Sequence, residues 1–264
     1  MKQGPFSKVA TATAFTLVEM LVVVALIAAI AMLAVPAFDA LRKSSGLTNT
    51  ASTIANLLQQ ARSYAMGRNT YVYIGLEEVD ALQAAPGPSQ TANPGIGRLA
   101  VAIVSRSDGN RGYDSDATGS PLWSNYGSGG NFAAPTPLRL FDGVHLADLG
   151  APSSSGEMAR PAVDSAYRLG SSTSTSATPF AWPLGRSLGA GQYNFTLVIQ
   201  FDPQGSARIL LPGHGDAIPK GIEIGLKPSR GNIAPDPATT EGGGGDQAAI
   251  QITGVSGAVH VYRP

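Results

Sequence analysis

The stretch FTLVEMLVVVALIAAIAMLAVPAF, from Phe15 to Phe38, determines which fold class this sequence predicts. Every residue from Met20 to Val35 is apolar, and Glu19 is the only charged residue in the stretch. As a helix, its 24 residues would extend about 36 Å, which is longer than the hydrocarbon core of a bilayer at about 30 Å. We therefore expect a membrane-spanning helix over residues 15–38.

Residues 1–14 precede this helix and form a short basic leader, with Lys2, Lys8 and no acidic residue. A secretory signal peptide would have an apolar core of about 7 to 15 residues, followed by a cleavage site made of small residues. Here the small residues 12–14 come before the apolar run, and the run is longer. We expect the apolar segment to be retained in the mature protein.

The helix is expected to continue over residues 39–68 with a different pattern. Apolar residues recur there at alternating steps of four and three positions, which is typical of a helix that buries one stripe. These residues are Leu47, Ala51, Ile54, Leu58, Ala61 and Ala65. Gly67 follows the last of them and is a typical stop signal. This amphipathic half should pack on a soluble domain.

Residues 69–264 are expected to form that domain, an antiparallel β head with long loops. The hydrophobic period changes from 3.6 to 2 after the helix, which is typical of strands. Strands are expected at 71–76, 98–104, 138–146, 193–201, 207–211, 221–226, 249–253 and 258–262. The connections 105–137 and 147–192 are long, and no long helical pattern separates the strands. The expected fold class is α+β, with a long N-terminal transmembrane and amphipathic helix packed on an antiparallel β-sheet head.

The composition argues against several classes of function. The 264 residues include 18 Lys and Arg against 18 Asp and Glu, so the net charge of zero gives no sign of a polyanion-binding surface. There is no cysteine, which excludes disulfides, thiolate metal sites and catalytic thiols. The 32 glycines and 19 prolines, in a chain that is 43% hydrophobic, indicate a folded protein with long connections.

Two segments carry a resemblance to a known family. Phe15-Thr16-Leu17-Val18-Glu19, preceded by small residues, resembles the processing site of type IV pilins and pseudopilins. The segment LLQQARSYAMGRNTYVYI, residues 57–74, resembles the H-type minor pseudopilins of type II secretion and the FimT-like minor pilins. The resemblance covers about residues 15–76, and it makes the expected fold pilin-like.

The resemblance implies a role in assembly. A prepilin peptidase would cut between Ala14 and Phe15, with Ala14 in place of the usual glycine, and the new amino group of Phe15 would be methylated. Glu19 would pair with the Phe15 amine of a neighbouring subunit. The partners would be other pseudopilins or pilins, through the N-terminal helix, and the bacterial inner membrane. The implied protein is a minor pseudopilin, single-pass in that membrane, with its C-terminal head in the periplasm or outside the cell.

Three alternatives remain open. The first is an ordinary signal anchor in which Glu19 is incidental. The second is a FimT-like minor pilin that contacts DNA during uptake, which would need a basic patch. Removal of residues 1–14 leaves 16 basic and 18 acidic side chains, so we do not expect a nucleic-acid partner. The third is a membrane-tethered enzyme, which would need a convergent polar site.

No catalytic site is expected. One segment is a weak candidate for a metal site. The pattern Gly185-Arg-Ser187-Leu-Gly189 lacks the strand before it and the helix after it that a nucleophile elbow requires. Oxygen-bearing side chains alternate in a turn-like segment and would suit calcium. They are Asp108, Asn110, Asp114 and Asp116. The same residue types are also common in plain turns, which is the competing interpretation. No other cofactor is expected.

Overall fold

The computed structural model describes residues 17–87, 90–109, 111, 132–152, 158–170, 176, 178–211, 217–233 and 246–264. The side chains of residues 29–45 also lie outside the described part. The chain divides into two compact units, Met1–Arg42 and Lys43–Pro264. The division into two units does not test the predicted boundaries of the leader (1–14), the two halves of the helix (15–38 and 39–68) and the head (69–264).

One helix, α1 (Leu17–Arg68), begins the described chain. All six residues of the predicted stripe are buried, so that pattern is confirmed. The helix ends one residue after Gly67, and Asn69 rather than glycine takes the left-handed conformation, with φ 50°. The Thr70 and Asn69 amides donate to the Ala65 and Met66 carbonyls, which is the Schellman arrangement for capping a helix.

The described strands form three sheets. The first has the order β10 (Ala207–Arg208), β9 (Leu197–Phe201), β1 (Val72–Asp80), β2 (Gly97–Arg106), β3 (Phe132–Ala133), with β4 (Arg139–Asp142) also on β2. The second has the order β13 (Val259–Tyr262), β12 (Ala248–Thr253), β11 (Gly221–Pro228), β5 (Val144–Leu146), with β6 (Arg168–Leu169) also on β11. The third pairs β7 (Phe180–Trp182) with β8 (Tyr193–Phe195). Among these strands, only β6 and β11 pair in parallel. β6 directly follows the short helix η2 (Ser165–Tyr167).

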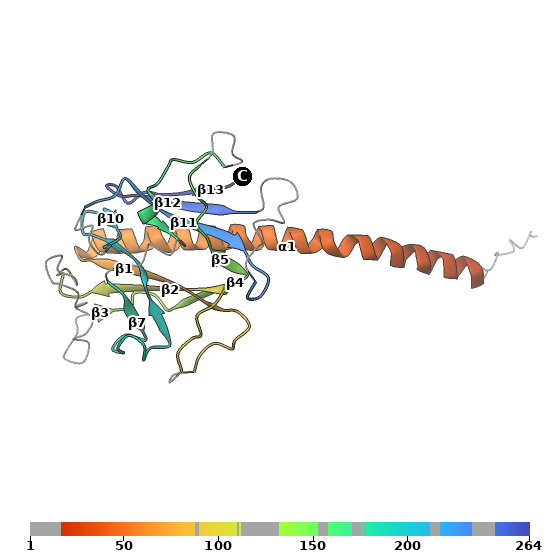
Figure 1. Cartoon of the computed structure of the whole chain (residues 1–264), viewed down its shortest axis with the longest axis horizontal. Helices are drawn as coiled ribbons and strands as arrows, with labels where there is room; N and C mark the ends of the chain where they lie inside the picture. Colours follow the sequence, from red (N-terminus) through yellow and green to blue (C-terminus); the bar gives the residue numbers. More distant parts are fainter. Residues whose placement is uncertain are drawn as a thin grey trace, which may run out of the picture. The chain divides into compact units, whose positions relative to one another are not determined.

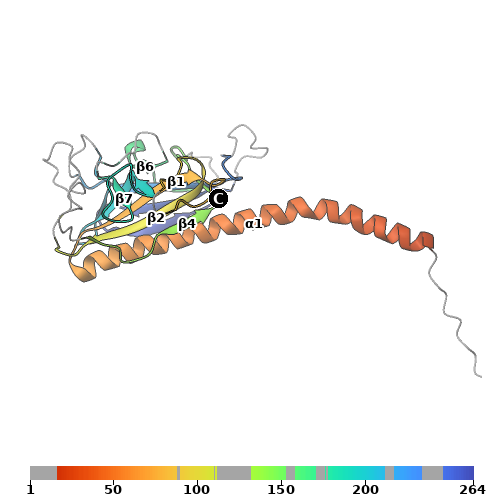
Figure 2. The ribbon, with the colours of Figure 1, turned by 90° about the horizontal axis from the view of Figure 1, so that it is seen from below.

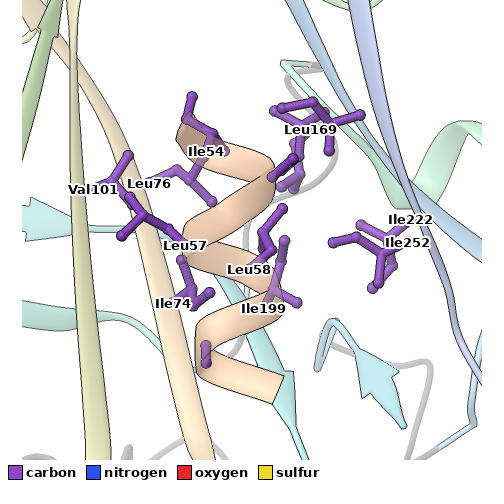
Figure 3. Close-up of a cluster of buried hydrophobic side chains, with 14 of the residues drawn as sticks. Ile54, Leu57, Leu58, Ile74, Leu76, Val101, Leu169, Ile199, Ile222 and Ile252 are labelled. Atoms are coloured by element: carbon purple, nitrogen blue, oxygen red, sulfur yellow. The ribbon is translucent and has the colours of Figure 1, made fainter. Parts of the chain in front are cut away.

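The main core lies where the second half of α1 meets the first two sheets. Figure 1 shows β1 and β2 on one side of this part of α1 and β11 and β12 on the other. Figure 2, turned by 90°, shows that the strands all cover one side of this part of the helix. In Figure 3, Ile54, Leu57 and Leu58 of α1 lie between two groups of strand side chains. These are Ile74, Leu76, Val101 and Ile199 in the first sheet, and Leu169, Ile222 and Ile252 around the second.

A second core covers the other face of the first sheet. Tyr73, Val104 and Val198 point to this face, and the β7–β8 hairpin covers them with Phe180 and Phe195. The two phenylalanine rings lie 4.9 Å apart. The first sheet is therefore buried on both faces.

The end of the chain is fastened to α1. Arg263 Nη1 donates to Thr48 Oγ1 at 2.9 Å, and its Nη2 donates to the Thr48 carbonyl at 3.0 Å and to Ser52 Oγ at 3.3 Å. These contacts join residues more than 200 positions apart in the sequence. The last strand, β13, pairs with β12 at the edge of the second sheet, and it corresponds to the strand expected at 258–262.

The predicted fold class needs a correction. The described residues form mostly antiparallel sheet, and no helix among them is long and apolar enough to cross a membrane. The prediction relied on the 24 residues from Phe15 to Phe38. At that end of α1, the structure describes the side chains of Leu17 to Ala28 only, which are 12 residues or about 18 Å of helix. The pilin-like class with a transmembrane helix on an antiparallel head is therefore wrong as stated.

The same finding contradicts the predicted location. A single-pass protein of the bacterial inner membrane requires a helix of about 20 apolar residues. Among the residues that the structure describes, no helix meets this requirement. The single-pass inner-membrane location is therefore withdrawn.

The predicted strands are each present, with changed bounds. The expected strand at 138–146 is divided into β4 and β5 by Gly143, which has φ 76°. The expected strand at 193–201 is divided into β8 and β9 at Thr196, because the chain there leaves one sheet for another. A tight turn after Phe201, in which the Gly205 amide donates to the Asp202 carbonyl, joins β9 to β10 in an antiparallel hairpin. The short strands β3, β6 and β7 were not predicted.

Candidate functional site

The first turns of α1 expose apolar side chains on every side of the helix. Nine of them lie between Leu17 and Ile27, and their exposed fractions range from 47% for Val23 to 81% for Leu17. We call Leu17–Ile27 the apolar segment. A helix that is apolar on all sides is stable in water only when other apolar surface covers it. The apolar segment is therefore a candidate surface for binding other chains.

Glu19 is the only acid of the apolar segment and lies exposed in the first turn of α1. A carboxylate in this position interacts favourably with the positive end of the helix dipole. The predicted cleavage residues Ala14 and Phe15 lie outside the described residues. The structure thus places Glu19, and leaves the processing site as a prediction.

A second candidate site lies where two strands of the first sheet separate. A cavity of about 610 Å³ opens there, and we call it the hollow. Its lining includes Leu76, Glu77, Glu78, His145, Asn194 and Leu197. Two consecutive acids of β1, whose side chains point to opposite faces of the sheet, thus line this opening.

Glu78 is held by three groups on its side of the sheet. The His145 Nδ1 atom lies 3.0 Å from both carboxylate oxygens of Glu78. The amides of Gly97 and Leu146 donate to the same carboxylate at 2.9 and 3.2 Å. Glu78 therefore links β1 of the first sheet to β5 of the second.

Glu77 points to the opposite face and has a different environment. Its Oε2 atom accepts a hydrogen bond of 2.6 Å from the Asn194 amide. Burial raises the pKa of Glu77 to about 7, and the Asn194 hydrogen bond opposes this rise without cancelling it. A carboxyl of this kind changes its charge near neutral pH.

The predicted calcium segment is described only at its start. Asp108 pairs with Arg106, whose Nε donates to Asp108 Oδ1 at 2.9 Å, while Asn110, Asp114 and Asp116 lie outside the described residues. Within the described part of the chain, no group of three or more acidic or histidine side chains could hold a metal ion. The calcium site stays a prediction.

Ser187 and the described histidines, the side-chain types that nucleophilic catalysis would need, lie on separate elements. Ser187 is exposed in the loop between β7 and β8, and His260 is exposed on β13. His145 faces Glu78 in the hollow, and His214 lies outside the described residues. The structure thus shows no catalytic grouping of Ser187 with the described histidines.

Comparison with protein-family models, with curated proteins and with solved structures returned no match. The resemblance to pseudopilins therefore rests on the sequence segments quoted above.

Sequence reasoning missed the hollow. Glu77 and Glu78 lie within a run of otherwise apolar strand residues, and two adjacent acids in a buried strand are a signal that could have been used. Asn194 and His145 carried no such signal, because their approach to β1 depends on strand pairing between distant segments.

Proposed function

We propose that this protein is a structural subunit of the minor pseudopilin type, which assembles with related subunits through its N-terminal helix into a type II secretion-like pseudopilus. The observation that carries the proposal is the apolar segment, with its exposed side chains around the whole helix. The resemblance of residues 15–19 and 57–74 to pseudopilins supports it.

The energy of covering the apolar segment favours assembly. Complete burial of a Val, Leu, Ile or Met side chain contributes about 1.5 to 3 kcal/mol. Nine such side chains are exposed, so even partial coverage by neighbouring helices would supply several kcal/mol for association. In a bundle of such helices, the apolar segment of each subunit would be covered by the apolar segments of its neighbours.

Glu19 would set the register of such a bundle. Packing of the apolar segment would remove water from its carboxylate, and a buried carboxylate is costly unless a cation pairs with it. Cleavage between Ala14 and Phe15 would create an ammonium group four residues before Glu19 in the sequence of every subunit. The Phe15 ammonium of one subunit would then neutralise Glu19 of its neighbour.

Processing is the first test. Co-expression with a prepilin peptidase should shorten the chain by residues 1–14, and intact-mass spectrometry should show a new N-terminus at a methylated Phe15. Ala14→Gly serves as the matched control, because it restores the residue usual at this position in the family. An unprocessed chain in both forms would contradict the proposal.

Assembly is the second test. Replacing Glu19 with leucine should reduce incorporation into fibres by at least about tenfold, because the pairing with the ammonium is lost. The measurement is the amount of the chain in sedimented fibres, formed with co-expressed pseudopilins and quantified by mass spectrometry. Asp246→Asn, which removes one exposed acid from the head, should leave incorporation unchanged. Equal incorporation of the Glu19→Leu variant and the unmodified chain would rule out the pairing.

A further inference from the structure

The strand β13 leaves one edge of the second sheet open. It is the last strand in the order of this sheet and pairs with β12. The Thr253 amide donates to the carbonyl of the residue directly before β13, and bonded pairs then recur at every second position. The amides and carbonyls of His260 and Tyr262 therefore point to β12, and those of Val259 and Val261 point away from it. Among the described residues, no group is hydrogen-bonded to these outward amides and carbonyls.

The side chains of β13 alternate between two faces of this edge. Val259 packs against the main core, and Val261 points to the same face, with an exposed fraction of 37%. His260 and Tyr262 point to the opposite face, and their rings lie 6.4 Å apart. A strand added to this edge would thus find valine side chains on one face and two aromatic rings on the other.

Both ends of the edge contact the second half of α1. Gly257, in the turn before β13, packs against Arg62, and Arg263, after β13, donates to Thr48 and Ser52. Arg62 and Thr48 are separated by about 21 Å of helix, the length of about six residues in an extended strand. Among the described residues, no carboxylate pairs with either arginine.

The charges of the elements at this edge are all positive. α1 from Lys43 to Arg68 includes three basic residues and no acid. Residues 254–264 include His260 and Arg263 and no acid, and β12 has no charged residue. A second copy of this chain would bring the same basic groups to the edge. An acidic segment would complement them.

We propose that the open edge of β13 binds an extended acidic segment of a partner protein, which adds to the second sheet as a further strand. The backbone of the segment pairs with the outward amides and carbonyls of Val259 and Val261. Its apolar side chains lie beside these two valines, and its acidic side chains face the basic groups around the edge. This proposal does not depend on the proposed assembly function.

The test is a titration of a fluorescent peptide with the full chain, followed by fluorescence anisotropy in a mild detergent that covers the apolar segment. The peptide EVTVEV places valines on one face of a strand and acidic residues on the other. Its binding should be saturable and should weaken as the salt concentration rises. The matched peptide KVTVKV has the same strand pattern with the opposite charge, and it should bind at least about fivefold more weakly.

Val261→Pro tests the strand pairing. Proline removes the outward N–H group of residue 261 and leaves the hydrogen bonds to β12 in place, so the affinity for EVTVEV should fall at least about fivefold. The matched control Val261→Thr keeps this N–H group and a β-branched side chain, and it should bind like the unmodified chain. Circular dichroism of both variants should match that of the unmodified chain.

Three results would overturn the proposal. The first is equal binding of EVTVEV and KVTVKV to the unmodified chain, a comparison that needs no variant. The second is equal affinity of Val261→Pro and Val261→Thr for EVTVEV. The third is self-association of the unmodified chain that Val261→Pro abolishes, because the edge would then bind a second copy.

Discussion

Replacing Glu223 with glutamine is expected to lower the free energy of unfolding by about 3 to 5 kcal/mol. Glu223 lies on β11 and pairs with Arg160, and the two side chains are only 2% and 4% exposed. The Arg160 Nε and Nη2 atoms donate to the two carboxylate oxygens at 2.7 and 3.3 Å. Loss of the carboxylate charge would leave a buried guanidinium without a counter-ion.

The surrounding hydrogen bonds add to this cost. Gln251 Nε2 donates to Glu223 at 2.7 Å and to the Pro161 carbonyl at 2.8 Å, and Arg160 also donates to the Gly150 carbonyl at 2.7 Å. These contacts fasten the connections around residues 150 and 160 to the outer face of the second sheet. A glutamine at position 223 would bring its side-chain NH2 group close to the N–H donors of Arg160 and Gln251, where it finds no acceptor.

Urea unfolding measured by circular dichroism would check this prediction. The double variant Arg160→Met with Glu223→Gln is the control, because it removes the unpaired charge and should be more stable than Glu223→Gln alone. A loss below about 1 kcal/mol in the single variant would show that Arg160 finds other acceptors or water.

Glu77→Gln is expected to change how stability depends on pH. The pKa of Glu77 rises from 4.5 to about 7 on folding, so the folded chain holds a proton that the unfolded chain loses between these values. The stability from that proton is complete below pH 4.5 and is lost as the pH rises through 7. The unmodified chain should therefore lose about 2 kcal/mol between pH 5 and pH 8 relative to Glu77→Gln.

Urea unfolding at the two pH values gives this difference directly. All other titrating groups are common to both proteins, so their contributions cancel in the comparison. Asp246→Asn provides the reference for the removal of one acidic charge from the surface. An identical pH dependence for Glu77→Gln and the unmodified chain would show that Glu77 titrates alike in the folded and unfolded states.

Local patterns made much of the described architecture predictable. The buried stripe of α1 follows from steps of three and four, and the β9–β10 turn follows from Pro203 and Gly205, where Gly205 has φ 85°. The division of strands at Gly143 and Thr196 depends on which sheet each half joins. That choice is made by tertiary packing, and the local sequence does not record it.

The candidate sites were predictable to different degrees. Glu19 stands out in the sequence because a lone acid interrupts an apolar run. The hollow depends on the unequal lengths of β1 and β9 and on the approach of Asn194 and His145 from distant parts of the chain. Such a site becomes visible only after the strand pairing is known.

The attachment of Arg263 to Thr48 and Ser52 has a practical consequence for labelling. It holds the C-terminal end beside α1 only a few residues after Lys43, where the second compact unit begins. A fluorophore or affinity tag added after Pro264 would therefore lie near that boundary. Gly205 and Gly257 pack against Arg62, which lies 14 positions after Thr48 or about 21 Å further along α1, so this region would stay clear of the label.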